Sequence, residues 1–307
     1  MTNLQHFGRR SPFLVWAICF AGIARAGGLE PPGPGSPRAL AASGYAAHAP
    51  AANPAELAAR LKALFKQWKA IPTAQVAEKV TVVKNRIDET VTTYVVTRLD
   101  ERPRPLPLSV EDDLNEALTT AIWESVFGLS PAAVTAAIKS NPPQHTAFVI
   151  QGTGSASNLY AAGFRIGYGN TFSTRVHAFA PEAGMYHAVG LEGGQLDGAI
   201  SGAVRLRSFG PHELRFLIWC LHVGSPEALT TVALCKFDGK QLRALWLRQN
   251  VPAAKLSFPD HQVVIQSNEV ARPHNSKGRV WRYRRETYRQ VVGGLELVKT
   301  DRWTEGD

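Results

Sequence analysis

Basic and aromatic side chains alternate near the C-terminal end of this sequence, and their types suit ligand binding. Seven Lys and Arg residues lie between positions 272 and 289, with a single acid, Glu286, and three aromatic residues among them. Cations meet the anionic groups of a polymer, and aromatic rings offer stacking surfaces. The sequence therefore predicts a binding surface for a polyanion or a sugar, made of Arg279, Trp281, Arg282, Tyr283, Arg284 and Arg285.

The same segment has a plainer interpretation as a solvated edge strand. Charged side chains on an edge strand prevent it from pairing with another chain. Polar and apolar residues are also mixed on both faces of the expected strand instead of being segregated. Both interpretations stay open at the level of the sequence.

Residues 151–158 are rich in Gly and Ser, which is typical of phosphate-binding loops and of serine nucleophile turns. The segment matches neither motif. A phosphate-binding loop requires a lysine after its last glycine, and none is present. A nucleophile turn places its serine at the centre of G-x-S-x-G before a helix, whereas Ser155 directly follows Gly154 and precedes an expected strand. A polar loop is predicted instead.

Four potential metal ligands recur at a spacing of five residues, namely His177, Glu182, His187 and Glu192. That spacing fits neither one face of a helix nor one face of a strand, so no metal site is predicted. The sequence likewise predicts no catalytic residue and no cofactor. The alternative function is a secreted hydrolase with scattered catalytic groups, for which the candidates are His177, Asp197 and Ser155.

The elements that must position these residues begin with a helix. Asn53 suits an N-cap and Pro54 suits the first helical position. An apolar stripe at helical spacing follows, made of Leu57, Leu61, Leu64, Phe65 and Trp68. A region dense in β-branched residues comes next, and its two halves, residues 80–84 and 90–99, predict a β-hairpin.

Two more helices are predicted before residue 146, where the pattern changes from helical to strand-like. The first begins at Ser109 and ends at Gly128, and a shorter one begins at Ser130. Twelve candidate strands follow, many separated by short turns such as Asp238-Gly239, which makes neighbouring strands antiparallel. The predicted fold class is α+β, with a long antiparallel meander that is sandwich-like, or partially barrel-like or propeller-like. Residues 53–145 and 146–307 are expected to form one globular unit.

The last hairpin permits a prediction of register. A two-residue turn at Gly293-Gly294 would place Val292 opposite Leu295 and Arg284 opposite Trp303. The second pair would bring a guanidinium against an indole ring, which contributes about 0.5–1 kcal/mol at an exposed site.

Two cysteines, Cys220 and Cys235, lie on consecutive predicted strands. A hairpin centred between residues 227 and 228 would place them opposite each other, as a disulfide requires. Two buried free thiols are the alternative. The third cysteine, Cys19, lies in the apolar N-terminal run and does not match a lipidation motif.

The N-terminus is expected to direct export. Arg9 and Arg10 form a basic head, residues 12–23 form an apolar run too short to span a bilayer, and Ala24-Arg25-Ala26 fits a signal peptidase site. Residues 1–26 are thus predicted to be a cleaved signal peptide. Residues 27–52, rich in Pro, Ala and Gly, are predicted to be a disordered tether. The protein is then periplasmic or extracellular, and its remainder contains no expected transmembrane segment.

Composition and net charge indicate the class of binding partner but do not identify a single partner. The chain is 45% hydrophobic and 19% charged, which is ordinary for a globular protein, and its formal charge of +9 falls to about +6 without Arg9, Arg10 and Arg25. Because an exported protein rarely meets nucleic acid, no nucleic-acid partner is expected. The sequence therefore predicts an exported, non-catalytic binding or structural module of the cell envelope. Its partner would be an anionic envelope polymer or another envelope protein.

Overall fold

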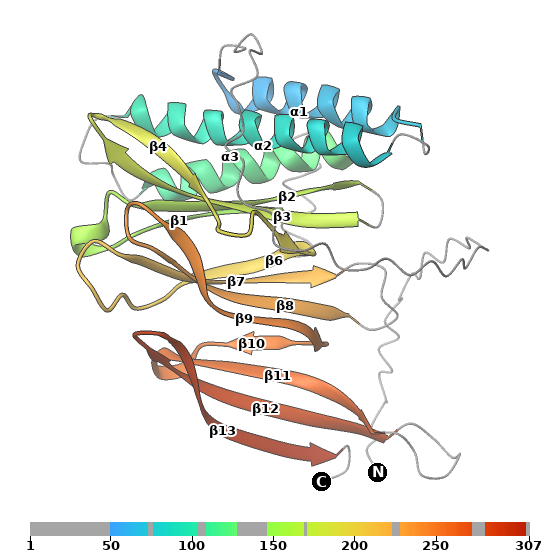
Figure 1. Ribbon diagram of the computed structural model, residues 1–307, viewed down its shortest axis with the longest axis vertical. Coiled ribbons are helices and arrows are strands. Elements are labelled where there is room, and N and C mark those ends of the chain that lie inside the picture. Colours follow the sequence, from blue (N-terminus) through green and yellow to red (C-terminus); the bar gives the residue numbers. More distant parts are fainter. Residues whose placement is uncertain are drawn as a thin grey trace, which may run out of the picture. The chain divides into compact units, whose positions relative to one another are not determined.

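A computed structural model describes residues 50–72, 76–102, 109–127, 146–168, 171–222, 228–271 and 280–304 (Figure 1). Helices come first and antiparallel strands follow, so the predicted α+β class is confirmed. The described helices are α1 (Pro54–Lys69), α2 (Val76–Asp100) and α3 (Ser109–Phe127). The predicted signal peptide, nearly all of the predicted tether and the short helix expected from Ser130 lie outside the described residues.

The sequence signals for α1 act as expected. The Asn53 side chain accepts a hydrogen bond from the Glu56 backbone N–H at 3.0 Å, and Pro54 occupies the first turn. Leu57, Leu61 and Phe65 are buried on one face of the helix. The predicted helix and its apolar stripe are confirmed.

The hairpin predicted over residues 80–99 is wrong, because α2 runs through the whole segment. Its buried residues follow helical spacing: Val83, Ile87, Val91, Tyr94, Val95 and Leu99. This stripe packs against the other helices and the first sheet, and that burial outweighs the modest β-preference of branched side chains. Sequence composition was thus a weaker guide here than periodicity.

The strands form three open antiparallel sheets, in which consecutive strands pair as in a meander, except that the short strand Leu196–Asp197 pairs with the strand Thr171–Glu182. The first sheet contains β1 (Ala147–Gln151), β2 (Tyr160–Tyr168), β3 (Thr171–Glu182), β4 (Met185–Gly190) and β5 (Leu196–Asp197). The second sheet contains β6 (Ala199–Arg205), β7 (Leu214–His222), β8 (Leu229–Phe237) and β9 (Leu242–Pro252). The third sheet contains β10 (Lys255–Ser257), β11 (Gln262–Ala271), β12 (Val280–Val291) and β13 (Gly294–Thr304).

Three hydrophobic clusters stack these elements in layers (Figure 1). The first cluster joins the helices to one face of the first sheet, and the second joins the other face of that sheet to the second sheet. The third cluster joins the remaining face of the second sheet to the third sheet. The arrangement is sandwich-like, which decides between the alternatives that the sequence left open.

This layering explains which strands lose their alternation of polar and apolar residues. In β7, Phe216 and Ile218 face the first sheet while Leu217 faces the third sheet, so the strand is buried on both sides. In β11 only one side is buried, by Val263 and Ile265. The third sheet therefore has an outer face that none of the three clusters covers.

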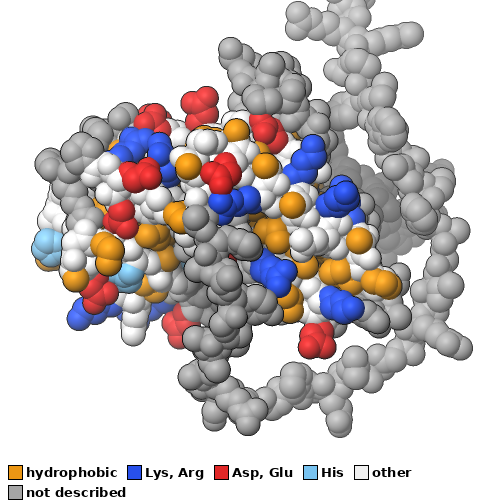
Figure 2. All heavy atoms as spheres, turned by 90° about the horizontal axis from the view of Figure 1, so that it is seen from above, with side chains coloured by type: hydrophobic (Ala, Val, Ile, Leu, Met, Phe, Trp, Pro, Cys, Tyr) orange, Lys and Arg blue, Asp and Glu red, His pale blue; other side chains and the backbone are white. Residues whose placement is uncertain are grey.

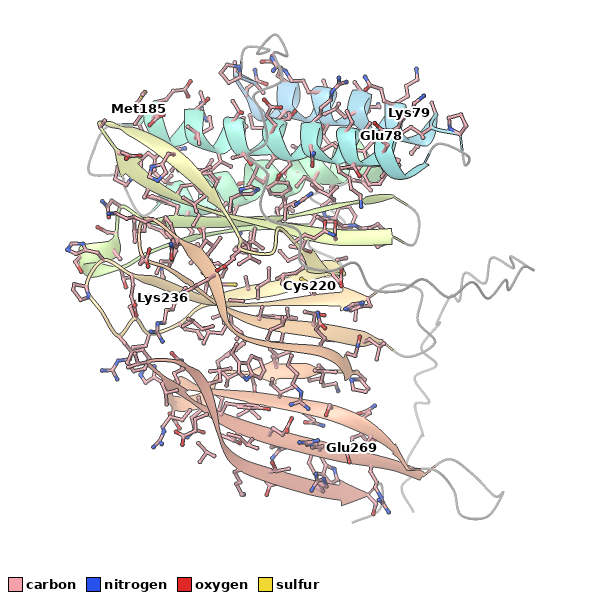
Figure 3. The ribbon with its side chains drawn as sticks, viewed as in Figure 1. Glu78, Lys79, Met185, Cys220, Lys236 and Glu269 are labelled. Carbon is pink, nitrogen blue, oxygen red and sulfur yellow. The ribbon has the colours of Figure 1, made fainter. Side chains whose placement is uncertain are left out.

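Of the two alternatives that the sequence left open for Cys220 and Cys235, the structure has the second: both thiols are free and buried, and no disulfide joins them. Cys220 pairs with Thr231, and Cys235 pairs with Phe216, so the two cysteines are offset by four residues, or about 13 Å along a strand. The hairpin turns about two residues earlier than predicted. Both thiols lie in the cluster between the first and second sheets, where Figure 3 shows Cys220.

None of the described helices combines the length and the hydropathy that crossing a membrane requires.

Candidate functional site

The residues predicted to bind a ligand divide between the two faces of the third sheet. On β12, Arg284, Glu286 and Tyr288 face the second sheet, while Tyr283 and Arg285 face outward. Arg279 and the side chain of Trp281 lie outside the described residues. The structure thus separates the predicted surface into an inner network and an outer face.

Arg284 belongs to the inner network, which is structural. It forms an ion pair with Glu286, which is 1% exposed, and Arg248 of β9 forms a second ion pair with the same carboxylate. Arg248 also donates a hydrogen bond to the Tyr288 hydroxyl at 2.8 Å. Burial alone would lower the pKa of Arg248, but its bonds to Glu286 and Tyr288 raise it. The network joins the second sheet to the third.

Arg282 is exposed and lies on the same side of β12 as Arg284, beyond the covered part of the sheet. Its strand neighbour on β11 is Glu269, which forms an ion pair with Arg284 at 3.3 Å. Figure 3 shows Glu269 on the third sheet. Arg282 therefore does not share a face with Arg285.

The predicted register of the last hairpin is also wrong. The turn is Val292-Gly293, so that Val291 pairs with Gly294, and β13 carries one extra residue, Val298, opposite Thr287 and Tyr288. Gly294 has φ of +150°, and a Cβ there would lie 3.3 Å from the Leu245 carbonyl oxygen of β9. This close approach favours glycine at the position and draws the turn toward the second sheet.

The corrected register changes the partner of Trp303. Tyr283 is directly opposite it, with ring centroids 5.6 Å apart and an angle of 17° between the planes. The Arg285 guanidinium lies 5.3 Å from the same indole ring, so the predicted cation–π contact involves Arg285 instead of Arg284. The two rings stack on each other, and Trp303 also supports Arg285.

The outer face of the third sheet holds a trough with a volume of 470 Å³. Register places its side chains in rows across the four strands. One row consists of Lys255, Gln266, Arg285 and Asp301, and the next consists of Ser257, Val264, Thr287 and Lys299. Gln262 lies at one end. We call this surface the outer trough.

Two cations of the outer trough have no acidic partner within the described residues. Lys255 and Arg285 are both exposed and form none of the ion pairs there, and Gln266 lies between them. Two strand spacings, about 10 Å, separate their backbones, which long side chains can bridge. By contrast, Lys299 Nζ lies 3.0 Å from the Asp301 carboxylate. The row can therefore hold one anionic group between Lys255 and Arg285, with the Gln266 amide as a further donor.

A strained turn lies at the end of the outer trough. Asp260 and His261, in the short 3-10 helix Pro259–His261, have φ of +46° and +62°, which is rare for residues other than glycine. The His261 carbonyl accepts a hydrogen bond from the Gln290 side chain at 3.1 Å. Pro259 and Gln262, on either side of the strained pair, line the trough. Strain of this kind is often found at functional sites.

The three residues proposed for a hydrolase site, His177, Ser155 and Asp197, each contact different parts of the structure. His177 of β3 is bonded to Asp88 of α2 at 2.7 Å. Ser155 Oγ accepts from the His212 backbone N–H at 3.4 Å. Asp197 pairs with Ser173, which is four residues from His177, about 13 Å along β3. The structure thus does not bring these candidates together into a nucleophile–base arrangement.

The potential metal ligands are likewise dispersed. His187 Nδ1 lies 3.6 Å from the Glu182 carboxylate, whereas His177 is hydrogen-bonded to Asp88 of α2. Among the described residues, no three His, Cys, Asp or Glu side chains gather in a way that could hold a metal ion.

Sequence reasoning missed the part of the outer trough that β10, β11 and β13 contribute, namely Lys255, Gln262, Gln266, Lys299 and Asp301. These residues are dispersed over about 45 positions, and only register brings them onto one face. A partial signal was present in β11, where buried Val263 and Ile265 alternate with Gln262, Val264 and Gln266, the half-buried residues of the other face.

The described residues of the helical side present a mixed surface. Figure 2 shows that cationic, anionic and hydrophobic side chains are interspersed over this face. Comparison with protein-family models, with curated proteins and with solved structures finds no match for the chain.

Proposed function

We propose that this chain is an exported, non-catalytic binding protein of a bacterial-type cell envelope, and that it holds an anionic envelope polymer in the outer trough. The observation that carries the proposal is the row in which unpaired Lys255 and Arg285 flank Gln266 on a face that no hydrophobic cluster covers. Cations without partners on a concave surface attract anions. The periplasmic or extracellular location is part of the same proposal.

The rest of the site supports a role in binding. Trp303 stacks with Tyr283 and lies against the Arg285 guanidinium, so the cation is held in place before a ligand arrives. Each exposed contact to an anion is weak, because water and salt screen it. A polymer can occupy several such sites at once, and this raises its overall affinity.

The test measures how strongly the protein is retained on a column of immobilised heparin, an anionic polysaccharide, at low and moderate salt. The double variant Lys255→Ala/Arg285→Ala is expected to bind about five- to ten-fold more weakly than the unmodified chain, because it loses both cations of the row. Retention of the unmodified chain should fall as salt rises.

The matched control is Lys62→Ala/Lys66→Ala, which removes the same charge from exposed positions on α1. It should keep nearly all of the retention. Equal losses in the two double variants would mean that only net charge matters, and the outer trough would then have no role. Arg284→Ala is unsuitable as a test, since it would leave the buried Glu286 without one of its partners.

A further inference from the structure

We infer that the ligand of the outer trough is an acidic polysaccharide with carboxylates on a hydroxyl-rich chain, and not a densely charged phosphate polymer. This inference rests on the proposed function and names the chemical class of its ligand. It follows from the balance of charged and neutral groups in the trough.

Neutral polar side chains outnumber the unpaired cations. Ser257, Gln262, Gln266 and Thr287 line the outer trough beside Lys255 and Arg285. Amides and hydroxyls both donate and accept hydrogen bonds, as sugar hydroxyls do. A polyphosphate chain offers only hydrogen-bond acceptors, so the acceptor oxygens of these amides and hydroxyls would find no donor on it. The composition therefore suits a ligand with many hydroxyls and few anionic groups.

Asp301 gives an independent argument. Its carboxylate lies in the same row as Arg285, on the adjacent strand, and lines the trough. Lys299 Nζ lies 3.0 Å from this carboxylate, so Lys299 pairs with Asp301 instead of adding a third unpaired cation to the trough. A continuous chain of phosphates would have to pass this carboxylate and would be repelled. A sugar hydroxyl can donate a hydrogen bond to it instead.

The centre of the outer trough is apolar. Val264, between Ser257 and Thr287 in the second row, supplies this apolar surface, because the Leu256 side chain packs in the third hydrophobic cluster on the inner face. The C–H face of a sugar ring can pack on such a floor and lose water from apolar surface. Neither Tyr283 nor Trp303 is among the residues that line the trough, so this floor, and not the aromatic pair, would contact the ring.

The experiment compares three soluble probes by isothermal titration calorimetry with the full chain: polygalacturonate, dextran and linear polyphosphate. Polygalacturonate is expected to bind most tightly. Dextran, which has hydroxyls but no charge, and polyphosphate, which has charge but no hydroxyls, should each bind at least ten-fold more weakly.

Two variants separate hydroxyl recognition from charge. Gln262→Ala/Gln266→Ala should weaken polygalacturonate binding about ten-fold and change polyphosphate binding less than two-fold, because it removes amides and no charge. Asp301→Asn should strengthen polyphosphate binding several-fold by removing repulsion, without strengthening polygalacturonate binding. Circular dichroism checks that each variant is folded.

The outcomes are distinct. If polyphosphate binds more tightly than polygalacturonate and binding depends on Lys255 and Arg285, the protein binds polyanions in this trough but the ligand class is wrong. Equal losses for both polymers in the glutamine variant would also overturn the ligand class. If the unmodified chain binds neither polyanion, the proposed function itself fails.

Discussion

At the scale of single residues, burial decides what a chemically versatile side chain can do. Arg284 and Arg285 are neighbours in sequence with identical chemistry, yet one forms an ion pair with a buried carboxylate and the other is exposed beside an indole. The two cysteines show the same dependence. Burial raises the pKa of the Cys220 thiol to about 12 and raises that of Cys235 further.

Both thiols are therefore expected to be inert in the folded protein. A water-soluble disulfide reagent should leave Cys220 and Cys235 unmodified under native conditions, since the reactive thiolate is absent and the side chains are enclosed. Both should be labelled in guanidinium chloride without reductant, as peptide mass spectrometry would reveal. A lack of labelling in denaturant would indicate a disulfide and would contradict the observed register.

At the scale of elements, α2 shows how tertiary packing overrides local preference. Its β-branched residues include both buried and exposed positions: Val91 is 0% exposed and Val82 is 41% exposed. Only the buried ones lie on the stripe against the other helices and the first sheet. The helix is thus stabilised by its packed face, and not by the intrinsic preference of its residues.

This difference predicts opposite effects of the same substitution. Val91→Ala should lower the free energy of unfolding by about 1–3 kcal/mol, because it creates a cavity. Val82→Ala should leave the stability unchanged or raise it by a few tenths of a kcal/mol, because alanine favours a helix. Urea denaturation measures both values. A clear loss of stability for Val82→Ala would instead favour a strand at this position.

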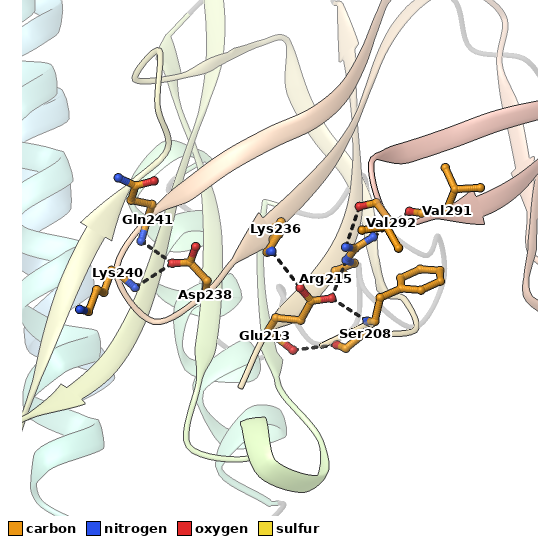
Figure 4. Close-up of polar contacts among 10 residues, drawn as sticks. Ser208, Glu213, Arg215, Lys236, Asp238, Lys240, Gln241, Val291 and Val292 are labelled. Carbon is orange, nitrogen blue, oxygen red and sulfur yellow. Dashed lines mark hydrogen bonds and ion pairs between the residues drawn. The ribbon is translucent and has the colours of Figure 1, made fainter. Parts of the chain in front are cut away.

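At the scale of the whole molecule, buried polar contacts join the second and third sheets. Figure 4 shows Arg215 and Lys236 converging on Glu213, with Arg215 also donating to the carbonyls of Val291 and Val292 at 2.9 and 2.8 Å. Arg215 is 1% exposed. Because the two carbonyls lie at the end of β12 and at the start of the turn that follows it, this cluster helps to hold the sheet that carries the outer trough.

Glu213 makes this connection sensitive to acid. Burial alone would raise its pKa, but hydrogen bonds from the Phe209 backbone N–H, Lys236 and Arg215 lower it to about 2. A lowered carboxyl pKa contributes stability above its unfolded value, near 4.5, and this contribution is lost as the pH falls toward 2. The contribution is on the order of 3 kcal/mol.

Urea denaturation of the unmodified chain and of Glu213→Gln between pH 7 and pH 2 tests this expectation. The unmodified chain should be more stable by several kcal/mol at pH 7, and the difference should shrink as the pH falls below about 4.5. A difference that does not change with pH would show that the Glu213 charge contributes nothing. Lys240 N–H and Gln241 N–H donate to Asp238 in a nearby exposed turn, so Asp238→Asn serves as a control with a smaller effect.

The sequence alone determined those features that depend on near neighbours. Asn53 and Pro54 placed the start of the first helix, and short turns with alternating residues predicted antiparallel strands. Hydrophobic periodicity contained the information for α2 as well, although composition suggested otherwise.

Only the tertiary structure decided which faces are covered and which strands lie in register. A shift of one residue moves every side chain of a strand to the opposite face, and turn position and bulges set that shift. For this reason the cysteines do not pair, Trp303 faces Tyr283, and Arg284 turns inward. The outer trough exists because register aligns residues from four strands on a sheet face that none of the three hydrophobic clusters covers.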